Sequence, residues 1–142
     1  MRPIIERVLY LKNIQVFSGI SDEMLGEMAI RFEELKVYSE EVLIRNGDTM
    51  TNLFLVLSGQ IGIYGQEKCL EVLDRGAYVG QLAILAPHES KITMIAHEDS
   101  ELLTLNAVAF LDFANEYVEV GLNIITILCE CIQGSRKIMK TF

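Results

Sequence analysis

The hydrophobic and polar positions of this chain change their period twice, and the pattern divides it into three parts. Up to residue 32, apolar side chains recur every three or four positions, which is typical of amphipathic helices. Ser21, followed by the acidic pair Asp22 and Glu23, marks a helix start. A hydroxyl there can cap free backbone N–H groups, and acids favour the positive end of the helix dipole. Residues 1–32 are therefore predicted to be N-terminal helices.

Residues 33–105 instead show short apolar runs separated by turn residues. Gly, Asn, Asp and Ser cluster between the runs, as at residues 46–48, 58–59 and 74–76. The predicted strands cover residues 35–38, 42–44, 53–57, 61–64, 70–73, 92–97 and 102–105. Many short strands at regular spacing indicate an antiparallel barrel or sandwich. Helical spacing intervenes only near residues 80–85, so a parallel sheet with crossover helices is not expected.

Residues 106–142 return to helical spacing, and Asn106 can cap the first of two predicted helices. The second is predicted from about residue 116 to 137 and carries two apolar stripes. One stripe comprises Val118, Leu122, Ile125, Cys129 and Ile132. The other comprises Val120, Ile124, Ile127 and Cys131. One stripe is enough to dock a helix on its own domain, so two favour a helix shared with a second subunit. The alternative is a helix buried on both sides in one domain.

Composition and charge narrow the class of protein. A length of 142 residues is typical of a single domain, here predicted over 1–142, and 51% hydrophobic residues are too many for a disordered segment. A net charge of −8 argues against nucleic-acid contact, because affinity for phosphates depends on Lys and Arg. The most apolar segment, residues 118–132, contains Glu119 and Glu130 and is not expected to span a membrane. Three irregularly spaced cysteines predict buried reduced thiols and a cytoplasmic location.

Candidate chemistry is concentrated in the turn at residues 78–85. Gly80 permits unusual backbone angles, and a short helical turn after it would leave the amides of Gln81, Leu82 and Ala83 unpaired. Unpaired amides at a helix N-terminus bind anions, most naturally a phosphate. Taken alone, a glycine before a short helix is more often only a turn.

Several segments together resemble a known family: residues 5–11, 16–21, 41–48, 53–61 and 80–96. They are similar to the cyclic-nucleotide-binding domains of catabolite-activator-type regulators, kinase regulatory subunits and gated channels. The resemblance implies a mainly β fold with flanking helices, namely a double-stranded β-helix or jelly-roll β-barrel with N-terminal helices and a long C-terminal helix. It also implies a non-catalytic regulatory domain whose ligand is cAMP or cGMP.

The resemblance places a phosphate-binding cassette at residues 80–96. Six positions keep the residue type of the family: Gly80, Leu82, Ala83, Leu85, Thr93 and Ala96. Gln81 stands where the family has a Glu that binds the ribose hydroxyl, and Ser90 where it has an Arg that binds the cyclic phosphate. A hydrogen bond from a charged group contributes about 1.5–3 kcal/mol, so loss of the Arg weakens binding roughly 10- to 100-fold. Lys91 is the candidate substitute, although strand alternation would point it to the opposite face from Ser90.

Three hypotheses about function follow. The first is a regulatory domain in signal transduction that binds a cyclic nucleotide weakly, pairs with a second copy through the C-terminal helix, and acts on an attached or partner effector protein. The second is a ligand-free copy that serves as a dimerisation or interaction module of a larger bacterial protein. The third is a cupin-like enzyme, but His88 and His97 are too far apart in sequence to form the usual metal-binding motif. No catalytic residue, metal ligand or cofactor is predicted.

Overall fold

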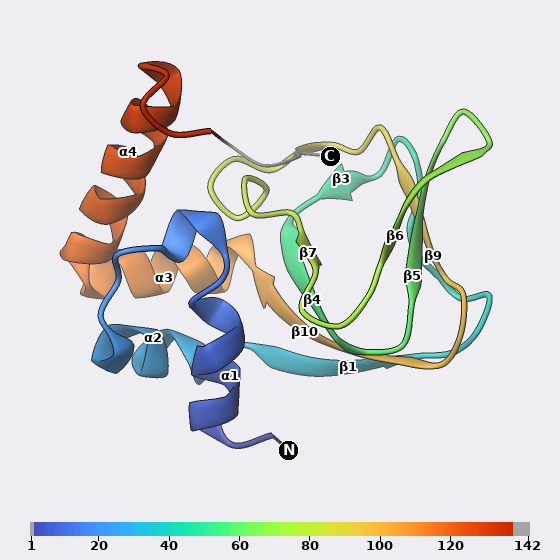
Figure 1. Cartoon of the computed structure of the whole chain (residues 1–142), viewed down its shortest axis with the longest axis horizontal. Coiled ribbons are helices and arrows are strands. Elements are labelled where there is room, and N and C mark those ends of the chain that lie inside the picture. Colours follow the sequence, from blue (N-terminus) through green and yellow to red (C-terminus); the bar gives the residue numbers. More distant parts are fainter. Residues whose placement is uncertain (1, 138–142) are drawn as a thin grey trace.

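The computed structural model describes residues 2–137. Residues 138–142, the end of the predicted C-terminal helical part 106–142, lie outside the described residues, as does Met1. Helices form both ends of the described chain and strands its middle, as the pattern predicts (Figure 1). The helical elements are α1 (Ile4–Leu11), the 3₁₀ helix η1 (Gln15–Phe17), α2 (Asp22–Ala29), α3 (Ala107–Glu116) and α4 (Val118–Ile132).

Both predicted helix caps are confirmed. The Ser21 hydroxyl accepts a hydrogen bond from the Met24 amide at 3.2 Å, and the Asn106 side-chain oxygen accepts one from the Val108 amide at 2.8 Å. Each bond satisfies a backbone N–H in the first turn that has no partner within its helix. The helices α2 and α3 therefore begin where the capping residues place them.

The strands of the described chain form two antiparallel four-stranded sheets and one two-stranded ribbon. The strand orders are β1-β10-β4-β7, β2-β9-β5-β6 and β3-β8. The strands are β1 (Glu33–Val37), β2 (Val42–Ile44), β3 (Thr49–Met50), β4 (Asn52–Ser58), β5 (Ile61–Gly65), β6 (Lys68–Leu73), β7 (Tyr78–Val79), β8 (His88–Glu89), β9 (Thr93–Ala96) and β10 (Ser100–Asn106). All seven predicted strands are present, and this arrangement is the expected jelly roll with flanking helices. The sequence pattern misses β3, β7 and β8, because two residues are too few to show a period.

The first sheet separates two apolar cores. Along β4, Leu53, Leu55 and Leu57 belong to a core shared with the helices, whereas Val56 belongs to the interior of the roll. This alternation is the period of two expected for a strand with both faces covered. The sheet therefore has the helices on one face and the roll interior on the other (Figure 1).

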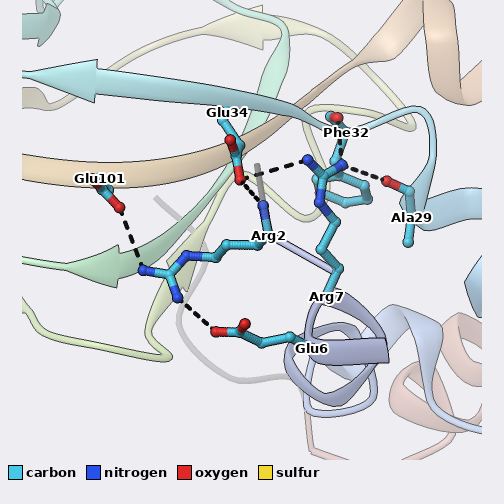
Figure 2. A network of polar contacts seen from close by, with 7 residues as sticks. All are labelled: Arg2, Glu6, Arg7, Ala29, Phe32, Glu34 and Glu101. Atoms are coloured by element: carbon cyan, nitrogen blue, oxygen red, sulfur yellow. Dashed lines mark hydrogen bonds and ion pairs between the residues drawn. The ribbon is translucent and has the colours of Figure 1, made fainter. Parts of the chain in front are cut away.

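A polar network joins α1 to α2 and to the first sheet (Figure 2). Arg7, only 1% exposed, donates to the carbonyls of Ala29 and Phe32 at 2.9 Å each, and these lie at and just beyond the end of α2. Its guanidinium is also 3.7 Å from Glu34. A hydrogen bond from the Arg2 backbone N–H, with the charges of Arg7 and Arg2, lowers the pKa of the Glu34 carboxyl. The relative position of α1 and α2 is thus fixed by a buried cation.

The C-terminal helix is shorter than predicted. The expected span of 116–137 is wrong at both ends, because Tyr117 leaves the helical conformation (φ −121°, ψ 82°) and Gly134 adopts a φ of +81°. A glycine in the left-handed region just beyond a helix is a common stop signal. The chain is therefore divided into α3 and α4 at Tyr117, and α4 ends at Ile132.

The two stripes of α4 lie in different environments. Three members of the second stripe are buried against the helical core: Val120, Ile124 and Ile127. The first stripe is exposed: Val118, Leu122, Ile125, Cys129 and Ile132. Burial on both sides within one chain is thus not observed. The predicted burial of the cysteines is also wrong, because Cys69 and Cys129 are exposed and Cys131 is half-buried.

Candidate functional site

A cavity of about 420 Å³ opens between the turn after β7 and the β3–β8 ribbon. Its walls are residues 78–83, Ala86, His88, Glu89 and Lys91. Four of the seven predicted site residues of the cassette line it consecutively, namely Gly80, Gln81, Leu82 and Ala83, and Lys91 is a fifth. The fold therefore brings the predicted turn and the predicted substitute cation to one cavity.

Gly80 is required by the fold itself. Its φ is +94°, and a Cβ atom there would lie 2.2 Å from the carbonyl oxygen of Asn52 at the start of β4. Only glycine allows both this angle and this approach of two backbones. The turn is thus held against the first sheet by a contact that any other side chain would break.

The backbone after Gly80 offers two free amides instead of three. The predicted short helical turn is a series of hydrogen-bonded turns, in which the Ala83 amide donates to the Gly80 carbonyl at 3.0 Å. The prediction of an unpaired Ala83 amide is therefore wrong. The amides of Gln81 and Leu82 make no hydrogen bond within residues 2–137. These two N–H groups can donate hydrogen bonds to an anion.

The Gln81 side chain is turned into the protein. It is 3% exposed, and its Oε1 atom accepts a hydrogen bond from the Val16 amide of η1 at 3.3 Å. Its Nε2 atom has no partner within residues 2–137. In the position that the family resemblance assigns to ribose binding, the side chain instead joins the turn to the N-terminal part. Beside it, the Gln15 amide donates to the Tyr78 hydroxyl at 3.2 Å.

Ser90 is also engaged by the protein itself. The residue is completely buried, and its hydroxyl donates to the Ile92 carbonyl at 2.8 Å and accepts from the Ile92 amide at 3.2 Å. Its backbone pairs with Asp48 and Gly47. Thr93 likewise accepts a hydrogen bond from the Asn46 amide at 3.0 Å. Neither Ser90 nor Thr93 lines the cavity, so the structure does not bring these two candidates together with the others.

Lys91 supplies the cation that Ser90 does not. Adjacent residues face opposite sides here as predicted, but Lys91 is the one on the cavity wall, and Ser90 is the one turned inward. Within residues 2–137, no carboxylate lies within ion-pair distance of the Lys91 ammonium. Glu89 on the same wall carries the opposite charge. The cavity thus combines one unpaired cation with two free amides, and an acid partly offsets their field.

The two histidines lie at separate places. His88 is exposed on β8 at the cavity, whereas His97 contacts the Tyr64 hydroxyl at 2.6 Å beside the second sheet. Within the described residues, no three His, Cys, Asp or Glu side chains gather in a way that could hold a metal ion. Nothing in the sequence indicates that His88 lies at the cavity, because the strand that carries it has only two residues and leaves no pattern.

Comparison with known proteins defines the family. Residues 34–117 match the sequence profile described as the cyclic nucleotide-binding domain. The match covers more than half of the chain, which therefore belongs to this family. The family resemblance seen in residues 41–48, 53–61 and 80–96 is confirmed.

The curated relatives include potassium channels, a cyclic AMP receptor protein and a cAMP-dependent protein kinase regulatory subunit. The chain is 28% identical to potassium channel KOR1 of Oryza sativa subsp. japonica, over 89% of this chain and 16% of the channel. It is 29% identical to the cyclic AMP receptor protein of Thermus thermophilus, over 67% of this chain and 46% of that protein. It therefore spans less than half the length of these curated relatives.

Solved structures show the same fold. The N-terminal domain of a transcriptional regulator from Streptomyces coelicolor A3(2) superposes with a TM-score of 0.83 at 20% identity, covering 94% of this chain and 99% of that one. The catabolite activator protein of Thermus thermophilus gives a TM-score of 0.68 at 24% identity, covering 85% of this chain and 59% of that one. Within residues 2–137, no helix has the length and apolar character needed to cross a membrane.

Proposed function

We propose that this chain is a non-catalytic regulatory domain that binds a cyclic nucleotide weakly in the cavity beside Gly80. The observation that carries the proposal is that Lys91 lines the same cavity as Gln81 and Leu82, whose backbone amides are free. A phosphate needs such donors, and two backbone amides with one cation supply them. The first candidates for the ligand are cAMP and cGMP.

The affinity is expected to be low for reasons visible in the site. A lysine acts as a point charge and lacks the two-pronged contact that an arginine makes with a phosphate. Glu89 on the cavity wall repels an anion. The Gln81 side chain is already bonded to Val16, so no side chain from that position is free for the sugar.

A chain of contacts leads from the cavity to α4 and supports a regulatory role. Gln81 accepts from Val16 of η1, and the side chain of Asn123 in α4 donates to the Ser18 carbonyl at 2.8 Å just after η1. A ligand that displaces the turn after Gly80 would displace η1 and thereby α4. The signal would reach an attached or partner effector protein through this helix.

Calorimetric titration with cAMP and then cGMP tests the proposal. We expect dissociation constants in the high-micromolar to millimolar range, and Lys91→Gln should weaken binding about 10-fold, because one charged hydrogen bond is lost. The matched control is Lys68→Gln on β6, which lies outside the cavity wall and should bind as the unaltered chain does. Absence of heat at millimolar ligand would overturn nucleotide binding and favour the interaction-module hypothesis.

A second function, pairing with another copy through α4, is supported by the exposed stripe of that helix. Val118, Leu122 and Ile125 are 57–61% exposed and Ile132 is 85% exposed, and this row of apolar side chains runs along about four turns of helix. Such a row on a solvated surface is typical of an interface. The exposed thiols of Cys69 and Cys129 suit a reducing compartment, so we place the protein in the cytoplasm.

Sedimentation equilibrium tests the dimer. Leu122→Glu should convert the dimer to a monomer, because it places a charge in the centre of the apolar row. Leu70→Glu changes another exposed leucine, on β6, and should leave the mass unchanged. A monomer mass for the unaltered chain at every concentration would overturn the proposal.

A further inference from the structure

A second concave surface lies on the helical side, between α1 and α2. It has a volume of about 420 Å³, and its apolar lining consists of Ile4, Ile5, Val8, Leu9, Gly26 and Ile30. We call it the α1–α2 groove. Ile5 is 79% exposed, Ile30 61% and Leu9 60%. Large apolar side chains gathered in one hollow, with this much exposure, mark a binding surface more specifically than scattered ones do.

The groove is preformed. Arg7 of α1 donates to the carbonyls of Ala29 and Phe32, and Figure 2 shows its guanidinium between them and Glu34. Breaking this buried contact to open or close the groove would leave a cation without partners in the interior, which is strongly unfavourable. A partner therefore meets a surface whose shape is already set, and this lowers the cost of binding.

Gly26 leaves a notch in the groove. A Cβ atom at this position of α2 would meet a single neighbouring atom within 4 Å, Cγ2 of Ile4 at 4.0 Å. Space beside the backbone is therefore open to a side chain from outside. Glycine is unfavourable inside a helix, so the protein is less stable with Gly26 than it would be with an alanine at this position.

The rim of the groove is acidic. Asp22, Glu23 and Glu27 border it, and Lys12 is the cation among its lining residues. Lys12 is 3.1 Å from Asp22 and is thus already paired. Glu23 and Glu27 have no ion-pair partner within residues 2–137. An occupant that complements this surface carries an apolar stripe with positive charges beside it.

The geometry limits the shape of the occupant. The groove is bordered by two helices of eight residues, each about 12 Å long, so it accommodates roughly two turns of a third helix. Helix backbones offer no free edge to a strand, whereas a helix can place residues i, i+4 and i+7 in such a groove. The exposed stripe of α4 from a second copy fits poorly, because α4 contains no lysine or arginine to complement the acidic rim.

We propose that the α1–α2 groove binds an amphipathic helix of a partner protein, with an apolar stripe flanked by Lys and Arg residues. This interaction is separate from nucleotide binding, because the groove shares no residue with the cavity beside Gly80. A side chain of the partner helix fills the notch at Gly26. The lysines and arginines of the partner lie against Glu23 and Glu27.

Fluorescence anisotropy with two labelled 14-residue helical peptides tests the proposal. One peptide has leucines at i, i+3, i+4 and i+7 spacing with lysines elsewhere, and the other has glutamates in place of the lysines. We expect the lysine peptide to bind and the glutamate peptide not to bind. The affinity of the lysine peptide should fall as salt is raised, because screening weakens the attraction to the rim.

The decisive variant is Gly26→Leu, which fills the notch. It should weaken binding of the lysine peptide at least 10-fold without lowering the Tm, because leucine is the better helix former. The matched control is Gly121→Leu in α4, where a Cβ atom also meets open space. This control should bind the peptide as the unaltered chain does.

Several outcomes would overturn the proposal. Equal binding of the two peptides, or no binding of the lysine peptide by the full chain, excludes a groove selective for basic helices. If Gly26→Leu binds the lysine peptide as tightly as the unaltered chain does, the notch at Gly26 is not part of the binding site. Loss of binding in Leu122→Glu but not in Gly26→Leu would place the peptide on α4 instead. Loss of the homodimer in Gly26→Leu would make a second copy the occupant.

Discussion

The β-roll and the helical half of the molecule differ in what they present to solvent. Among residues 2–137, the large apolar side chains exposed on the roll are Tyr38, Leu70 and Val72. The helices and the residue after α2 expose many more: Ile5, Leu9, Ile30, Val108, Leu111, Val118, Leu122, Ile125 and Ile132. The roll instead holds a cavity with a cation and free amides. The roll is thus suited to binding a small ligand, and the helical half is suited to binding proteins. The variants below test this difference between the two halves.

The two faces of α4 should give the largest contrast. Ile124→Ala removes a side chain that is 2% exposed in the helical core and should cost about 2–5 kcal/mol of unfolding free energy. Leu122→Ala on the exposed face should change it by less than about 0.5 kcal/mol in the monomer. Urea denaturation at a concentration where the chain is monomeric measures both. Equal losses would mean that the outer face packs within the chain, and the division would fail.

Two glycines of the roll provide the next contrast. Gly80→Ala places a Cβ atom 2.2 Å from the Asn52 carbonyl oxygen at a φ of +94°, and should cost about 3 kcal/mol. Gly76→Ala also has a positive φ, +87°, but meets nothing within 4 Å. It should cost about 1 kcal/mol, the strain of the backbone alone. If thermal unfolding shows equal losses, the close approach of the cavity turn to β4 is not what requires glycine.

Gln81 joins the two halves and should affect stability more than ligand affinity. Gln81→Ala leaves the buried Val16 amide without its acceptor and should cost about 1–3 kcal/mol. Because the side chain is turned away from the cavity, the affinity for cAMP should change far less than in Lys91→Gln. Denaturation and calorimetry on the same two variants separate the effects. A greater loss of affinity in Gln81→Ala than in Lys91→Gln would assign the side chain to the ligand.

The smallest effect is a gain in the helical half. Gly26→Ala should stabilise the protein by about 0.5–1 kcal/mol, because the new Cβ atom has space and alanine favours the helix. Gly19→Ala, at a φ of +88° and with Asn123 Oδ1 2.9 Å from the new atom, should destabilise it. The sign of each change in Tm is the test. A loss of stability for Gly26→Ala would show that the notch in the α1–α2 groove is already filled.

Much of the fold was predictable from the sequence because its signals are local. The changes of period located the helical ends and seven strands, and Ser21 and Asn106 located two helix starts. The alternating stripes of α4 separated its buried from its exposed face. Gly134 also carried a local stop signal for α4, and residues 133–137 are polar, so the predicted end at residue 137 ran past a signal that the sequence itself contained.

The candidate site was predictable only in part. The position of the turn and the need for Gly80 followed from the sequence and the family resemblance. The roles of the polar side chains did not follow. The sequence around Gln81, Ser90 and Lys91 shows where the turn and the loop lie, but it does not show which of these side chains point into the cavity and which point into the protein. The ribbon β3–β8, which brings His88 and Glu89 to the cavity, was too short to leave a period.

The sequence by itself determined the order and type of the longer elements, since periodicity, capping and turn preferences act between near neighbours along the chain. The tertiary structure alone decided that Gln81 bonds to Val16, 65 positions away, and that Ser90 is buried by its own loop while Lys91 faces the cavity. The direction of a side chain depends on which distant backbone groups require a partner. That requirement exists only once the strands have paired and the helices have packed.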